Sequence, residues 1–272
     1  MNWTRRKFIK SGIIASITLL ILDAFWLEQV FIETKEFYLN GTTAEKPHLK
    51  IVQISDLHLT KVGTALKKKI EEVNALRPDL IVLTGDSVDN ANNLPLLEEL
   101  MGLMDKNIQK AAILGNWEYW SNTDISKLNL LYQRYNCDLL INSTKQYQLN
   151  NQTISVTGTD DLVGGNADIE TALVPYRKSN HHIILNHCPA YTDQIVRSLS
   201  TYKKPDLILS GHTHGGQVNL FGFIPFLPEG SGNYLKGWYK PGGVDLYVSK
   251  GIGTSLLPVR FGSRAEISVF NI

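Results

Sequence analysis

The sequence predicts an α/β fold in which two sheets stack as a sandwich with helices on the outside. Five short apolar runs, several of them rich in β-branched residues, are bounded by turn residues and cover 49–54, 80–83, 111–114, 182–185 and 207–209. Runs of this length are typical of buried strands, and the stretches between them have the periodicity of helices. Further β-rich runs with Asn turns occupy residues 138–159, which indicates where a second sheet begins.

Local signals predict the remaining elements. Phe37-Tyr38-Leu39 predicts an edge strand, and the polar segment from Asn40 to Lys46 predicts a linker. Five helices are expected, the first ended by Arg77-Pro78: Thr64–Leu76, Pro95–Asp105, Asp124–Tyr135, Ala167–Tyr176 and Tyr191–Leu199. We therefore divide the chain into a signal or anchor segment (1–28), a linker with an edge strand (29–48) and one folded domain (49–272).

Each of the five apolar runs ends on residues that can bind a metal. They are Asp56 and His58, Asp86, Asn116, His187, and His212 with His214. Taken singly, an Asp after Gly is usually a turn or a helix cap, and a His at a strand end is usually structural. Right-handed crossovers, however, bring strand exits to a common edge, where open α/β sheets bind ligands. Carboxylate, amide oxygen and imidazole suit divalent cations, and a two-metal site needs about seven such groups.

In these ordered blocks, the chain resembles the calcineurin-like metallophosphoesterase superfamily. It is most similar to the bacterial, exported or membrane-anchored branch that includes relatives of UDP-diacylglucosamine pyrophosphohydrolase; the resemblance covers residues 49–272, including Leu246–Thr254 and Leu257–Phe261. The resemblance implies two metal sites that share Asp86, one formed by Asp56, His58, Asp86 and His214, and one completed by Asn116, His187 and His212.

The resemblance also implies a reaction. A hydroxide that bridges the two metals would attack phosphorus, with Asp86, Asn116 and His187 as catalytic residues. The ligand set suits manganese, iron and zinc alike, so the identity of the two divalent ions stays open. The expected substrate is a phosphodiester or pyrophosphate, and a lipid-linked or wall-linked one would suit a protein of the cell envelope.

One position departs from the family pattern. The usual block is Gly-Asn-His followed by an acid, whereas this chain has Gly115-Asn116-Trp117-Glu118. The resemblance implies that the missing His protonates the leaving oxygen or stabilises charge on the phosphoryl group. An indole N–H can donate a hydrogen bond but cannot deliver a proton. Three interpretations follow: an enzyme for good leaving groups, an acid supplied by Glu118, His181 or His182, or a metal-dependent envelope-binding protein with little hydrolytic activity. His181 and His182 could equally be structural residues at the far end of their strand.

The N-terminus predicts export from the cytoplasm. Thr4 to Lys10 reads Thr-Arg-Arg-Lys-Phe-Ile-Lys and precedes an apolar run from Gly12 to Leu22, a pattern typical of the twin-arginine export machinery. The alternative is a simple basic flank before a membrane helix, and both place the folded domain outside the cytoplasm. Because no good cleavage site follows, we expect an uncleaved membrane anchor with Trp26 at the interface. The expected location is thus the cell membrane or cell envelope.

Other features carry weaker expectations. A net charge of +1, with no basic stripe interleaved with aromatic residues, argues against nucleic-acid binding. A disulfide between Cys137 and Cys188 is permitted outside the cytoplasm, but the two are expected to be independent. Cys188, beside His187, is expected to pack and not to bind a metal. Asp160-Asp161 is expected to cap a helix approach, although it could form an acidic metal site. The segment Leu220–Leu227 either forms an apolar lip for a lipid beside His214 or packs beneath the site.

Overall fold

Two mixed sheets form the predicted sandwich. The computed structural model describes residues 4–24, 28, 31–39, 41–43, 49–199, 204–220 and 222–272. The first sheet has the strand order β1-β12-β2-β3-β4-β5 and the second the order β10-β11-β9-β8-β7-β6. The strands of the first are β1 (Glu33–Tyr38), β2 (Lys50–Ile54), β3 (Leu80–Thr84), β4 (Gln109–Ile113), β5 (Cys137–Leu139) and β12 (Glu266–Asn271). Those of the second are β6 (Ser143–Leu149), β7 (Gln152–Gly158), β8 (His181–Leu185), β9 (Leu207–Ser210), β10 (Gly237–Tyr239) and β11 (Leu246–Val248).

Parallel pairing places the predicted strand exits of each sheet at one edge of that sheet. In the first sheet β2, β3 and β4 run parallel, and in the second β8 and β9 do. The apolar side chains between the sheets form one buried core that includes Ile51, Val82, Leu185 and Leu209. Both sheets bury their inner faces in this core. The polar residues that follow the strands therefore lie at the edge of the sandwich, beyond the core.

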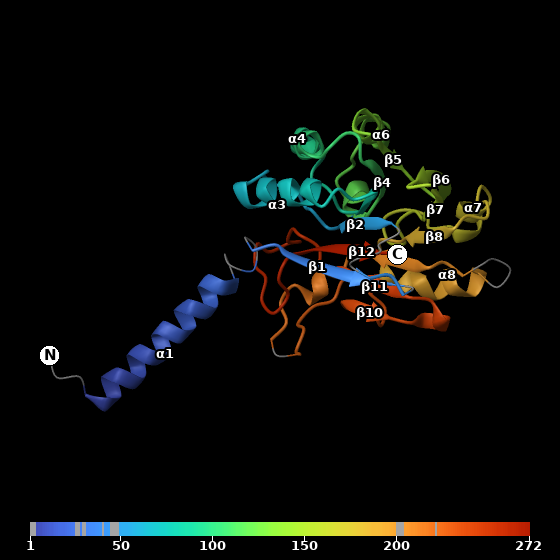
Figure 1. Cartoon of the computed structure of the whole chain (residues 1–272). Helices are drawn as coiled ribbons and strands as arrows, with labels where there is room; N and C mark the ends of the chain where they lie inside the picture. The colour runs from blue at the N-terminus through green and yellow to red at the C-terminus, as the bar shows by residue number, and fades with distance from the viewer. Residues whose placement is uncertain are drawn as a thin grey trace.

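Helices cover the outer faces, as Figure 1 shows for α3, α4 and α6 above the first sheet. The helices are α3 (Thr64–Ala75), α4 (Leu94–Leu103), α5 (Asn116–Trp120), α6 (Ile125–Arg134), α7 (Ile169–Leu173) and α8 (Thr192–Ser198). The five predicted helices are present, and α7 and α8 cover the second sheet. Helix α7 is shorter than predicted, because Asp168 caps its start through the N–H of Thr171 and Pro175 follows its end.

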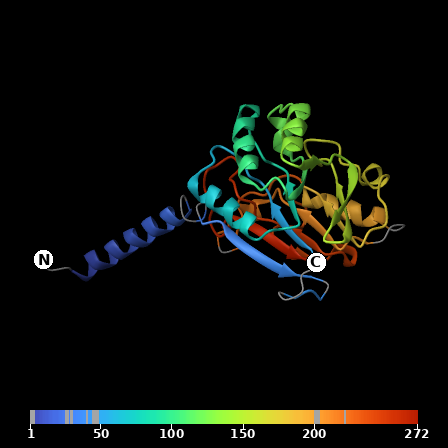
Figure 2. The ribbon, with the colours of Figure 1, turned by 45° about the horizontal axis from the view of Figure 1, so that its top comes forward.

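The N-terminal segment forms helix α1 (Arg5–Leu22), which projects away from the sandwich in Figures 1 and 2. Within the described residues, none of the helices combines the length and the apolar content needed to span a bilayer. The predicted anchor is therefore not shown, and Trp26 lies outside the described residues, as do Asn40 and residues 44–46 of the linker. The predicted edge strand is present as β1, which pairs in parallel with β12.

Candidate metal centre

The structure brings the seven predicted ligand residues together at the exits of β2, β3, β4, β8 and β9. All seven are buried. Five of them have a left-handed backbone, with φ of 49° at Asp56, 41° at His58, 52° at Asp86, 73° at His212 and 51° at His214. This conformation is uncommon outside glycine and concentrates at functional sites. The strand exits therefore hold these side chains in unusual orientations that aim them at one another.

Glycines let two carboxylates lie against neighbouring loops. A Cβ atom at Gly115 would overlap the carboxylate of Asp86, and a Cβ atom at Gly211 would overlap that of Asp56. The Gly-Asp and Gly-His pairs of the sequence thus have a steric role at this site, because the loop backbones approach the ligands more closely than any larger residue would permit.

One group of side chains converges around His58 and His214. Their Nε2 atoms are 3.0 Å apart. The Nε2 atom of His58 lies 3.6 Å from Oδ2 of Asp86, and that of His214 lies 3.8 Å from Oδ1 of Asp56. Four ligand atoms of the predicted types therefore face one small volume.

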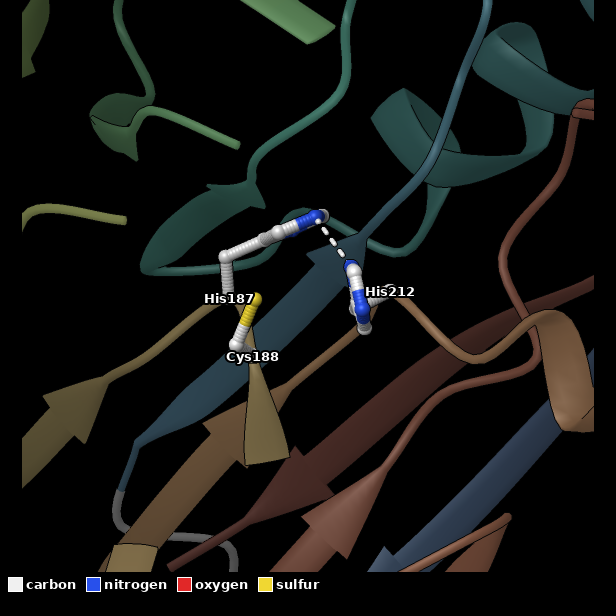
Figure 3. A group of neighbouring side chains, drawn as sticks. All are labelled: His187, Cys188 and His212. Carbon is white, nitrogen blue, oxygen red and sulfur yellow. Dashed lines mark hydrogen bonds between the residues drawn. The ribbon is translucent and has the colours of Figure 1, made fainter. Parts of the chain in front are cut away.

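A second group converges around His187 and His212, shown in Figure 3 with the two imidazoles pointing toward one another. Nδ1 of His212 lies 3.3 Å from Nε2 of His187 and 3.0 Å from Oδ1 of Asn116. Nε2 of His187 lies 3.2 Å from Oδ2 of Asp86. The same oxygen of Asp86 thus faces both groups, as expected of a bridging carboxylate.

Hydrogen bonds orient three of the four imidazoles. Nδ1 of His187 donates to the carbonyl oxygen of Thr84 at 2.8 Å, and Nε2 of His212 donates to that of Glu229 at 2.6 Å. Nδ1 of His58 bonds the carboxylate of Asp89. In each case the other ring nitrogen points into the group, where it would offer a lone pair to a cation that displaces its proton, which is the usual arrangement of a metal-binding histidine. This donor set fits divalent cations.

Two supporting residues were missed by the sequence analysis. Asp89 follows Asp86 by three residues, and the frequent pairing of a metal-binding histidine with a carboxylate could have pointed to it. Arg260 is fully buried and places Nη2 3.2 Å from Nδ1 of His214. A guanidinium can only donate, so His214 is not oriented as the other three histidines are. No local pattern indicated this contact, because it joins residues 46 positions apart.

Charge coupling within the site is strong. Burial disfavours the charged form of each group, yet Asp86 raises the pKa of His187 well above its ordinary value, and His187 in turn lowers the pKa of Asp86. A hydrogen bond to Asp89 and the charge of Asp86 raise the pKa of His58. Burial and the charge of His58 lower the pKa of His214. Divalent cations could replace these protons as the charge partners of Asp86, with the imidazoles neutral.

A buried polar network supports Asp56 from below. Nε2 of Gln53 donates to Oγ1 of Thr84 and to the carbonyl oxygen of Ser210, which links the two sheets directly beneath the site. Oγ1 of Thr84 lies 2.7 Å from Oγ of Ser55, which donates to Asp56 at 2.5 Å. Each of these polar groups is buried, so the network fixes one position for the carboxylate.

Glu118 holds the loops that carry two ligands. Its carboxylate accepts the backbone N–H groups of Asp86 at 3.1 Å, Ser87 at 2.6 Å and Gly115 at 2.8 Å. Burial and the charge of Asp86 raise the pKa of Glu118 to about 7, whereas the N–H groups of Gly115 and Ser87 favour its ionised form. Because both oxygens are engaged by backbone, Glu118 positions the exits of β3 and β4 and does not face a substrate.

The two histidines considered as alternative acids lie far from the site. His181 and His182 begin β8, where they bond Gln152 and Thr157. About 3.3 Å per residue separates them from His187, which puts His182 about 16 Å away. They are structural residues at the far end of the strand.

Trp117 lies beside the first group. Its backbone N–H donates to Oδ1 of Asp86 at 2.9 Å, and its ring meets that of His58 edge-on at 6.0 Å between centroids. It also packs against the exposed ring of Trp120, with 5.6 Å between the ring centroids. An indole thus occupies the rim of the site at the position of the expected acid.

Cys188 lies under His187 and His212 (Figure 3) and could complete a metal-binding group by distance alone. Its thiol instead donates to Oδ2 of Asp161 at 3.1 Å, and burial together with Asp161 raises its pKa well above the ordinary value. A protonated thiol is a poor ligand, which agrees with the predicted packing role. The expectation that Asp160-Asp161 caps a helix was wrong. Their carboxylates accept N–H groups of the loop, from Asn166 and Gly164, and Asp168 caps α7 instead.

Comparison with known proteins identifies the family. A model described as calcineurin-like phosphoesterase matches residues 49–216, well over half of the chain. The chain belongs to this family. Members bind divalent metals, and the His/Asp clusters described above could hold such ions. The phosphoesterase is therefore expected to be a hydrolase, in agreement with the sequence analysis.

The phosphoesterase has relatives in several organisms. It is 32% identical to an uncharacterized metallophosphoesterase of Bacillus subtilis (strain 168), YkuE, over 99% of this chain and 97% of that protein. It is 33% identical to one of Campylobacter jejuni, Cj0846, over 84% of this chain and 60% of that protein. A solved 5'-nucleotidase precursor of Thermus thermophilus superposes with a TM-score of 0.47 at 14% identity, covering 75% of this chain and 49% of that one. These relatives' names give no substrate for this chain, so the predicted branch remains a prediction.

Proposed function

We propose that this phosphoesterase hydrolyses phosphodiester or pyrophosphate bonds with two divalent cations held by the seven converging side chains. The observation that carries the proposal is the position of Asp86, whose Oδ2 faces His58 on one side and His187 on the other. When bound, two divalent cations would lower the pKa of an attacking water and neutralise charge on the phosphoryl oxygens. The proposed ions are manganese, iron or zinc.

The chain's own residues would position the substrate and limit its leaving group. Asn116 begins α5 and carries an amide that can donate to a phosphoryl oxygen as well as ligate a cation. Trp117 offers only an N–H donor where the family places a histidine. Without proton transfer to the leaving oxygen, the site favours groups that depart as stable anions, such as phosphates and phenolates.

The proposed substrate is a lipid-linked or wall-linked phosphoester of the cell envelope. Support comes from Arg5 and Arg6, which precede the apolar run of α1, because paired arginines before an apolar segment are typical of twin-arginine export. The proposed partners are accordingly the export machinery, the membrane or cell wall, and a phosphorylated substrate, with no nucleic acid.

A second candidate function is metal-dependent binding in the envelope with little hydrolysis, favoured by Trp117 alone. Hydrolysis of bis-p-nitrophenyl phosphate in the presence of Mn²⁺, Fe²⁺ or Zn²⁺ separates the two. The enzyme proposal expects metal-dependent turnover that Asp86→Asn abolishes. A wild-type rate equal to that of Asp86→Asn would contradict the enzyme proposal and favour the metal-dependent binding protein.

A further inference from the structure

Six exposed apolar side chains gather on two adjoining loops. We name them the apolar rim: Leu220, Phe223, Phe226, Leu227, Leu256 and Leu257. Phe223 is 66% exposed, Phe226 64% and Leu256 75%, while Phe221 lies outside the described residues. Outside α1, the rim accounts for six of the fourteen exposed large apolar side chains among the described residues. Single exposed apolar residues are ordinary, but a cluster of this size indicates an interaction surface.

The first rim loop is attached at both ends to the metal centre. It begins just after His214, and its far end supplies the carbonyl oxygen of Glu229 that accepts a hydrogen bond from His212. The second loop is tied to the first by the side chain of Gln217, which donates to the carbonyl oxygens of Ser255 and Leu257 at 3.0 Å. The loops that carry the rim are therefore anchored to the candidate site, while the rim side chains themselves face solvent.

The first loop has an inner and an outer side. Ile224 packs against Gly216 on the inner side, where it fills the space that a Cβ atom would need. The outer residues are held by a tight turn, in which Leu220 and Phe223 exchange backbone hydrogen bonds of 2.8 and 3.1 Å and Asn219 accepts the N–H of Gly222. These N–H groups already have hydrogen-bond partners within the turn. The turn can therefore enter an apolar phase without losing hydrogen bonds to water at these groups.

The rim adjoins the point where α1 joins the domain. The N–H of Arg260 donates to the carbonyl oxygen of Ala24 at 2.9 Å, and Glu28 accepts the N–H groups of Gly262 and Ser263. Phe261 of the same segment forms a bridge with Val218 of the first rim loop. A surface that binds α1 would therefore also lie near the apolar rim.

The charges of this corner favour an anionic bilayer as that surface. Helix α1 exposes four apolar side chains after a basic start: Phe8, Ile9, Ile13 and Ile14 follow or alternate with Arg5, Arg6, Lys7 and Lys10. Arg264 is exposed beside Ser263, and Nζ of Lys236 lies 3.1 Å from the carbonyl oxygen of Gly262. Apolar side chains with basic ones beside them, as along α1 and next to the rim, are typical of surfaces that insert between anionic headgroups.

We propose that the apolar rim inserts into the surface of a phospholipid bilayer, so that the metal centre draws its phosphoester from the membrane and not from solution. The proposal rests on the proposed function, because it names the phase in which that site meets its substrate. The rim would enter among the acyl chains while Arg264 and Lys236 contact headgroup phosphates.

The test places a fluorophore on the rim of the full chain. Phe226→Cys and Leu256→Cys are each labelled with a thiol-reactive, environment-sensitive nitrobenzoxadiazole. The native Cys137 and Cys188 are buried and will not compete for the label. Leu130→Cys on α6, where the native side chain is 61% exposed, is the matched control. Vesicles of phosphatidylcholine with phosphatidylglycerol should shift emission at positions 226 and 256 to shorter wavelength and leave position 130 unchanged.

A second measurement uses the unlabelled double variant F223S/F226S. Its partitioning onto the same vesicles should fall by roughly 10- to 100-fold, as expected for removing large side chains from an apolar phase. Hydrolysis of soluble bis-p-nitrophenyl phosphate should not change, so the two proposals fail separately. Emission at position 226 that is unaltered by vesicles overturns the rim proposal. A shift that depends on protein concentration without lipid also overturns it, in favour of self-association.

Discussion

At the scale of single residues, Trp117 has the clearest kinetic consequence. Without a proton donor, the wild-type rate should depend steeply on the pKa of the leaving group. Trp117→His should then rescue alkyl esters preferentially, by up to roughly 10²- to 10⁴-fold, the usual contribution of general acid catalysis. Steady-state rates on paired alkyl and nitrophenyl esters measure this effect.

The same substitution affects packing, since the indole contacts both His58 and Trp120. The smaller ring costs about 1 to 3 kcal/mol of stability, so melting temperature and metal content must accompany the kinetics. If the wild-type protein already cleaves both ester types at equal rates, another group supplies the proton, and the replacement of His by Trp117 has not removed the general acid.

Asp89 offers a second test at this scale. Its carboxylate orients His58, so Asp89→Asn should weaken metal binding about 10- to 100-fold, the usual effect of removing such a partner. Asp138→Asn is the control, because Asp138 is similarly accessible but pairs with Lys145 away from the site. Equal Mn²⁺ affinities of the two variants, measured by calorimetry, would show that Asp89 does not tune the centre.

At the scale of elements, Glu118 joins the exits of β3 and β4. Glu118→Gln would turn an amide N–H₂ toward backbone N–H groups in a buried site, which should lower the free energy of unfolding by about 2 to 4 kcal/mol. Glu98→Gln removes only the exposed ion pair with Arg134 and should cost less than about 1 kcal/mol. Urea unfolding compares them, and similar losses would contradict the bridging role of Glu118.

Local patterns predicted the strands up to β9 and helices α3, α4, α6, α7 and α8, but not β10, β11, β12 or α5. They also placed the seven side chains together, because neighbouring parallel strands end at the same edge of a sheet. They did not predict that β12 lies between β1 and β2, antiparallel to β2 and parallel to β1. They also missed the contact from Arg260 to His214. Such pairings join distant segments, and no periodicity within either segment specifies the partner.

At the scale of the whole molecule, the proposed role of α1 is export of the sandwich domain. If Arg5 and Arg6 direct export, a reporter fused after Ile272 should appear outside the cytoplasm, and Arg5→Lys combined with Arg6→Lys should block its export. Protease accessibility of the reporter in intact cells provides the measurement. Continued export of the double variant would replace the twin-arginine proposal with the general secretory route.

The central claim is that the seven residues form one centre for two cations that share Asp86. Native mass spectrometry during titration with Mn²⁺ tests it most directly, with phosphodiesterase activity followed at each added equivalent. Two ions should bind per chain, activity should require the second, and Asp86→Asn should lose both the second ion and the activity while remaining folded. A single ion at saturation, or full activity with one, would contradict the claim.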